Sequence, residues 1–204
     1  TEVNIEEKGK EIYMLFIGNG TGPFNWENNN VINYDYIMSK MTDSYKKSFE
    51  YSYTLGAFPT IELIKNEPEQ VMQVIISPEL EDRATITELC NLHRIPMIES
   101  KKQVERLSDK ENVYIIGVFR KFEKELSKDA PHIVLVNPSN MGNLGTIIRT
   151  AIGFGIHDIA MIEPAADIYN PKVVRASMGA LFHMNFKYFD SFESYAAKYE
   201  GHEF

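Results

Sequence analysis

The sequence of 204 residues lacks several features that would assign it to a particular class of protein. It has one cysteine, Cys90, which excludes an intramolecular disulfide framework and a multi-cysteine metal site. Its apolar runs are short, as at residues 133–136, and none approaches the ~20 residues that span a bilayer. No basic region precedes an apolar stretch at the N-terminus, so no signal peptide is visible. We therefore expect a soluble, cytoplasmic protein without a membrane partner.

The composition is that of an ordinary globular protein, with 44% hydrophobic and 25% charged residues. The net charge of −8 at first disfavours a nucleic-acid partner. However, residues 1–43 carry three lysines against seven acidic residues, which is half of that excess. The rest of the chain is nearly balanced and has basic clusters at residues 101–106 and 120–128, which are typical either of a solvated helix face or of an RNA contact. The net charge thus weakens an RNA hypothesis without excluding it.

Apolar periodicity and turn signals predict an alternation of strands and helices. The expected strands are at residues 12–17, 51–55, 71–77, 96–98, 113–119, 133–136 and 159–162. The expected helices are at residues 34–47, 59–66, 82–92, 101–107 and 143–152. Such alternation predicts an α/β fold.

The same patterns suggest a division of the chain. We expect an N-terminal arm without assignment at residues 1–35 and a small α/β domain at residues 36–120. A charged linker that ends in proline follows at residues 121–131. The second domain, residues 132–204, begins with a continuous apolar strand of the type that is buried in parallel sheets.

Asparagines and glycines concentrate between a strand and a helix, from residue 137 to residue 145. Asn143 is a good candidate for the N-cap, and Gly142 and Gly145 would allow a ligand to approach the backbone amides closely. Arg149 lies among apolar residues and must bind an anion or a carboxylate, or extend to solvent. The spacing alone is equally consistent with a functional arginine and with a salt bridge at the end of the helix.

A second stretch, residues 170–180, places Lys172, Arg175 and Ser177 near small residues. This pattern indicates either a surface that faces phosphate or simply the basic start of a helix.

These two stretches carry a resemblance. Residues 143–151, NLGTIIRTA, followed by residues 171–180, PKVVRASMGA, closely resemble the first conserved motif region of the TrmH/SpoU family. The members of that family are RNA ribose 2′-O-methyltransferases of the knotted SPOUT superfamily. Residues 50–119 resemble the small α/β domain that binds the RNA substrate in many of them.

The resemblance implies a small substrate-binding domain followed by an incomplete α/β-knot (SPOUT) domain with a parallel sheet. It implies catalytic roles for Asn143 and Arg149, S-adenosylmethionine as co-substrate, rRNA or tRNA as partner, and a homodimer. We expect Asn140, Lys172, Arg175 and Ser177 to contact the RNA. A guanidinium does not act as a base near neutral pH, so Arg149 is interpreted as a phosphate and ribose clamp.

The sequence also departs from the family pattern. The later motifs that line the S-adenosylmethionine pocket do not occur in it, so no cofactor-binding residue is assigned. We expect a piece of a longer enzyme that is inactive alone. If the native chain ends at Phe204, the alternative is a non-catalytic RNA-binding module, and a third hypothesis is a nucleotide-binding α/β protein without RNA. The five histidines are scattered, so no metal is expected.

Overall fold

In the computed structural model the structure describes residues 5–8, 11–14, 44–108 and 112–202. The chain forms two compact units, residues 1–43 and residues 44–204. In the first unit, strands β1 (Ile5–Lys8) and β2 (Glu11–Met14) pair antiparallel. Strand β2 overlaps the expected strand at residues 12–17, the end of which lies outside the described residues.

Most of the helix expected at residues 34–47 lies outside the described residues as well. Its last residues, 44–47, are described and are not helical. One physical reason is a tertiary contact, because the Tyr45 hydroxyl donates a hydrogen bond to the Asp167 carboxylate, far along the chain.

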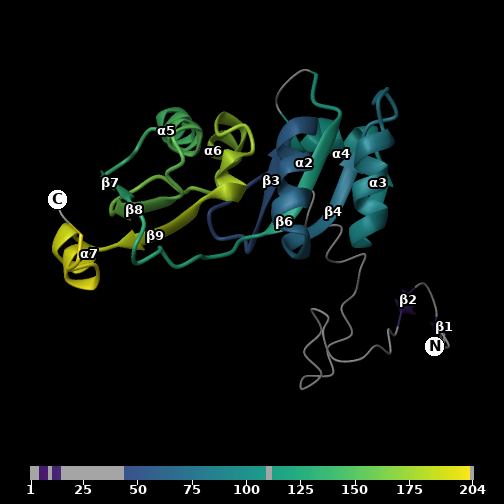
Figure 1. Cartoon of the computed structure of the whole chain (residues 1–204). Helices are drawn as coiled ribbons and strands as arrows, with labels where there is room; N and C mark the ends of the chain where they lie inside the picture. Colours follow the sequence, from purple (N-terminus) through teal and green to yellow (C-terminus); the bar gives the residue numbers. More distant parts are fainter. Residues whose placement is uncertain (1–4, 9–10, 15–43, 109–111, 203–204) are drawn as a thin grey trace. The chain divides into compact units, whose positions relative to one another are not determined.

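The unit of residues 44–204 contains a four-stranded sheet in the order β3-β6-β4-β5 (Figure 1). Its strands are β3 (Tyr51–Leu55), β4 (Val71–Ile76), β5 (Met97–Glu99) and β6 (Ile115–Arg120). The helices that alternate with them are α2 (Ala57–Asn66), η2 (Pro68–Gln70), α3 (Ala84–His93) and α4 (Lys101–Leu107). All of the strands and longer helices predicted between residues 51 and 120 are confirmed, with small shifts of their ends.

A second, wholly parallel sheet has the order β7-β8-β9. Its strands are β7 (His132–Val136), β8 (Asp158–Ile162) and β9 (Asn185–Phe189). The connecting helices are α5 (Met141–Gly153), α6 (Pro171–Ala176), η3 (Ala180–His183) and α7 (Phe192–Lys198). The predicted mixed α/β class with a parallel sheet is confirmed, and β9 is a strand that the sequence analysis missed.

Alternate residues of β8 enter two different apolar clusters. Ile159 and Met161 pack with α5 and α6, whereas Ala160 and Ile162 pack with Leu126 and with aromatic residues of α7. Strand β8 is therefore covered on both faces, which explains its continuous apolar sequence. Strand β7 has a similar sequence but lies at an edge of the sheet, so the prediction that it is buried was wrong.

Apolar side chains of the two sheets meet in one core. Leu63 of α2 and Phe119 of β6 belong to the same buried cluster as residues of α5, α6 and β9. Residues 121–131 form no helix or strand and connect the sheets. The buried Leu126 and the half-buried Phe122 of this segment pack onto the core. The domain boundaries expected from the sequence stay a prediction.

Candidate functional site

The loop after β7 ends in the N-cap of α5. The Asn140 side chain accepts a hydrogen bond from the backbone N–H of Asn143, at 2.9 Å, while its own backbone is extended. The prediction that Asn143 is the N-cap was therefore wrong. Asn143 occupies the third helical position, which leaves its side chain exposed and without a capping role.

Arg149 lies on the exposed side of α5, six residues further along. Within the described part of the chain, the side chains of Asn143 and Arg149 have no hydrogen bond or ion pair. Of the two options that the sequence left open for Arg149, the structure gives an arginine whose guanidinium is available to a ligand. The catalytic roles of both residues stay predictions.

Gly145 is the point where α5 and α6 touch. A Cβ at this position would lie 2.5 Å from the Ala176 Cβ and 2.8 Å from the Val173 carbonyl oxygen. Gly145 thus permits the two helices to pack, and it does not expose its backbone to a ligand as the sequence suggested. Gly142 is the exposed glycine of this helix terminus.

Helix α6 carries the second group of predicted residues. The Asn170 side chain caps it by accepting a hydrogen bond from the Lys172 N–H at 3.0 Å, and Pro171 begins it. Lys172 and Arg175 are exposed. Ser177 has no exposed surface, and its hydroxyl donates to the Val174 carbonyl at 2.8 Å, so in this structure it supports the end of the helix.

The helix pair α5 and α6 contains cations and no acidic residue. Within the described part, Arg149, Lys172 and Arg175 form no ion pair, whereas Lys187 and Lys198, on β9 and α7, both contact Glu125. We use the term cationic face for the exposed side chains of Arg149, Lys172 and Arg175 on α5 and α6. Because neither helix contains an acidic residue, these cations favour the binding of anions despite the net charge of the chain.

The carboxyl ends of the three parallel strands meet at one edge, because Val136, Ile162 and Phe189 are in register. Hydrogen bonds from Asn137 N to Ile162 O (3.0 Å) and from Glu163 N to Phe189 O (2.9 Å) extend this pairing into the loops. Open α/β sheets bind ligands outside this edge.

An open depression of about 330 Å³ lies at that edge and is lined by Lys47, Glu163, Pro164, Ala165 and Asp190. The sequence analysis missed Glu163 and Asp190. Asp190 directly follows β9, the strand that was not predicted, so no signal marked it as an edge residue.

Two tyrosines, the half-buried Tyr188 and the buried Tyr169, hold the loop of residues 163–170. The Tyr188 hydroxyl donates to Ala166 O at 3.0 Å and accepts from Ile168 N at 2.9 Å, and burial raises the pKa of Tyr188 to about 12. Burial likewise raises the pKa of Tyr169, whose hydroxyl accepts from Phe122 N at 3.0 Å. Both phenols stay protonated near neutral pH, so their role is to position this loop.

No helix among the described residues is long and apolar enough to cross a membrane. In the same residues no group of three or more His, Cys, Asp or Glu side chains is arranged to hold a metal ion.

Comparison with known families identifies the segment that carries this site. Residues 130–204 match the model described as the SpoU rRNA Methylase family. We refer to these matched residues, which hold the parallel sheet and the α5–α6 pair, as the SpoU methylase segment, and the match confirms the resemblance found in the sequence.

Individual relatives agree with that family. The chain is 42% identical over 52 residues to a 23S rRNA (uridine(2479)-2′-O)-methyltransferase of Streptomyces viridochromogenes. This alignment covers 26% of this chain and 18% of that protein. It is 35% identical over 79 residues to the human mitochondrial rRNA methyltransferase 3, covering 34% of this chain and 19% of that protein. The chain thus spans about a fifth of these relatives.

Solved structures agree with the fold. The SpoU methyltransferase AviRb of Streptomyces viridochromogenes, in complex with AdoMet, superposes with a TM-score of 0.62 at 22% identity over 74% of this chain and 59% of that chain. A putative TrmH-family RNA methyltransferase of Porphyromonas gingivalis gives a TM-score of 0.60 at 23% identity, with the same coverage. At these identities the likeness concerns the fold.

Proposed function

We propose that this chain belongs to an S-adenosylmethionine-dependent enzyme that methylates a ribose 2′-hydroxyl of structured RNA. The observation that carries the proposal is the cationic face, which lies on the segment that matches the SpoU methylase family. Two relatives are named as 23S rRNA 2′-O-methyltransferases, and others as rRNA methyltransferases, which favours rRNA over tRNA as the substrate.

In this proposal Arg149 binds the RNA backbone at the target nucleotide. Its guanidinium stays protonated, so it does not act as the base. It stabilises the negative charge that develops on the 2′-oxygen, and the Asn143 amide, three residues after the cap, orients the ribose. S-adenosylmethionine supplies the methyl group when it is bound.

The depression at the carboxyl edge suits part of that co-substrate. The carboxylates of Glu163 and Asp190 can accept hydrogen bonds from hydroxyl or ammonium groups, and Lys47 can bind a carboxylate. Structural neighbours are described as bound to AdoMet, which supports S-adenosylmethionine as the methyl donor.

A homodimer and a cytoplasmic location are also part of the proposal and rest on the resemblance to the family. An apolar surface lined by Ile133, Ile147, Phe154 and Ile156, on β7, α5 and the turn after α5, offers a contact region for a second copy. Sedimentation velocity over a range of protein concentrations tests the dimer.

The central test is methyl transfer by the Arg149→Ala variant of the full-length protein that contains this chain. Transfer of labelled methyl groups from S-adenosylmethionine to rRNA is expected to fall more than tenfold, while far-ultraviolet circular dichroism stays unchanged. Lys65→Ala, which removes an exposed cation from α2, serves as the control and is expected to retain activity. Retention of more than about a tenth of the activity in Arg149→Ala would contradict the role of Arg149.

The second candidate is an RNA-binding module without catalysis, which the cationic face alone would also support. Isothermal titration calorimetry with S-adenosylmethionine separates the two proposals, because binding of the methyl donor would contradict the module without catalysis.

A further inference from the structure

The turn between α6 and η3 packs tightly against α2. Gly179 in this turn has a left-handed backbone (φ +83°), and a Cβ there would lie 2.7 Å from the Glu62 Cβ and 3.4 Å from the Pro59 Cα. No side chain at residue 179 would fit this approach without a shift of α2. The end of α6 and the first turns of α2 are therefore in direct contact.

Side-chain hydrogen bonds fix this contact. His183 Nε2 lies 2.8 Å from a carboxylate oxygen of Glu62. The Asn66 side-chain amide donates to the Glu62 carbonyl at 2.8 Å and lies 3.2 Å from the same histidine nitrogen. The turn and α2 are thus held at a fixed separation before any ligand arrives.

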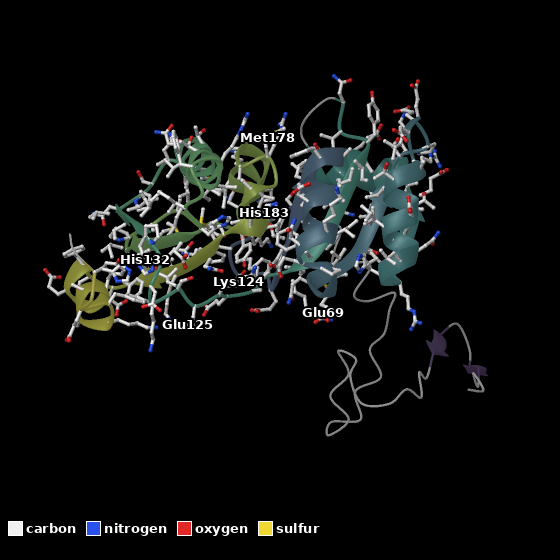
Figure 2. The ribbon with its side chains drawn as sticks, viewed as in Figure 1. Glu69, Lys124, Glu125, His132, Met178 and His183 are labelled. Atoms are coloured by element: carbon white, nitrogen blue, oxygen red, sulfur yellow. The ribbon has the colours of Figure 1, made fainter. Side chains whose placement is uncertain are left out.

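Two exposed apolar side chains flank the contact. Phe58, directly before Pro59, is 55% exposed, and Met178, directly before Gly179, is 43% exposed. Figure 2 labels Met178 at the end of α6 that lies nearest to α2. Met178 also has a left-handed backbone (φ 51°), a conformation that costs energy for a residue with a side chain. Nothing in the core requires either side chain at these positions.

One of the exposed cations, Arg175, adjoins the same place. The Met178 N–H donates to the Arg175 carbonyl at 3.0 Å, so Arg175 and Met178 share one turn of backbone. Arg175 belongs to the cationic face, and the two helices that carry this face contain no acidic residue. Proteins recognise unpaired RNA bases by stacking them against aromatic and apolar side chains while cations bind the adjacent phosphates.

We propose that Phe58 and Met178 form a stacking platform for an unstacked nucleobase of the RNA substrate, and that Arg175 binds the phosphate beside that base. This inference rests on the proposed function, since it names the RNA contact that would present a ribose to Arg149. The platform combines a residue of α2 with a residue of the SpoU methylase segment, so the two sheets contribute jointly to substrate binding.

The test uses the full chain and an RNA stem-loop with 2-aminopurine at one position of its loop. Wild-type protein is expected to bind the RNA with an affinity that falls steeply with salt, and the fluorescence of 2-aminopurine is expected to decrease on stacking. Phe58→Ala is expected to weaken binding about tenfold and to remove the fluorescence change. Phe58→Trp is expected to retain both, because the indole also stacks.

Three variants make the result specific. Phe192→Ala is the matched control, because it removes the same side chain from an exposed position (38%) on α7, outside the surfaces proposed here, and it is expected to leave binding unchanged. Met178→Ser is expected to weaken binding without a change in the salt dependence. Arg175→Ala is expected to reduce the slope of log affinity against log salt concentration by about one.

The outcomes separate the two proposals. If wild-type protein binds RNA but Phe58→Ala and Phe192→Ala behave alike, the platform is refuted and the proposed function stands. If wild-type protein does not bind RNA at any salt concentration, both are refuted. Recovery of binding in Phe58→Leu to the level of Phe58→Trp would show general apolar contact, as a protein partner would make, and would also overturn the stacking proposal.

Discussion

Two asparagines near the start of α5 have different structural roles, although the sequence pattern does not distinguish them. Asn140 caps the helix, and Asn143 presents a free amide within the exposed helix start. Asparagine favours the N-cap position, so residue type does not distinguish the two. Their distance from the end of β7 decides which one caps the helix. The cap was predictable as a feature of this loop, but the residue that forms it was not.

Replacement of each asparagine should separate stability from activity. Asn140→Ala is expected to lower the free energy of unfolding by about 1 kcal/mol, because one backbone N–H at the helix start loses its acceptor. Asn143→Ala is expected to leave stability nearly unchanged and to reduce methyl transfer. Urea denaturation and a methyl-transfer assay measure the two effects. An equal loss of stability in both variants would contradict this assignment.

Gly145 gives a second test at the scale of one residue. Gly145→Ala is expected to destabilise the protein by about 1–3 kcal/mol, because the added methyl group overlaps Ala176 and the backbone of α6. Gly153→Ala is the control, since nothing lies within 4 Å of its added Cβ and alanine favours a helix. Thermal unfolding should therefore show opposite shifts, and a stable Gly145→Ala variant would disprove the close helix contact.

At the scale of elements, residues 121–131 do more than connect two sheets. Lys187 and Lys198 both contact the Glu125 carboxylate, and these contacts lower the pKa of Glu125 to about 2. Another residue of the segment, Lys124, pairs with Glu67. The sequence indicated only a charged segment that ends in proline, because the partners of these charges lie more than 50 residues away.

The depressed pKa predicts a dependence of stability on pH. Folding favours the ionised form of Glu125, so its contribution is complete above the ordinary pKa of 4.5 and is lost as the pH falls toward 2. The difference in melting temperature between wild type and Glu125→Gln is therefore expected to shrink from pH 5 to pH 2, and to shrink further with added salt. Glu123→Gln, an exposed neighbour, is the control. A difference that does not vary with pH would refute this reading.

On the scale of the whole unit of residues 44–204, the two sheets share a core. Phe182 of η3 packs edge-on against Phe119 of β6, with ring centroids 5.4 Å apart, and both are almost fully buried. Ser52 of β3 also donates a hydrogen bond to the Tyr169 carbonyl at 2.5 Å. These contacts predict that both sheets unfold together.

Phe182→Ala tests this cooperation. The large cavity is expected to cost about 3–5 kcal/mol, and hydrogen exchange should speed up in β4 and β6 as well as in β8 and β9. Denaturant unfolding is expected to show one transition. Two separate transitions, or faster exchange confined to the second sheet, would show that the sheets fold independently.

The sequence predicted most of the helices and strands, but it did not predict the tertiary contacts that each of them makes. Local patterns located most strands and helices from residue 51 onward, because periodicity and turn residues act within a few positions. The edge position of β7, the contact of Gly145 with α6 and the burial of Ser177 depend on residues distant in sequence. The same holds for the candidate site. Its motif residues could be identified from the sequence, whereas the depression beside Glu163 and Asp190 depends on the tertiary structure and could not.

The tight contact at Gly145 has a mechanical consequence for recognition. The helices α5 and α6 cannot slide or separate without opening this contact. The backbone positions of Arg149 and Arg175 are therefore held at a fixed separation. An RNA that binds across both helices must bring its phosphates to that fixed spacing. The RNA, rather than the protein, must then deform, and this deformation costs free energy. The free energy of deformation would be small for flexible bulges and loops and large for stiff paired helices. Selection among RNAs would then depend on how easily each one bends, in addition to the bases it displays.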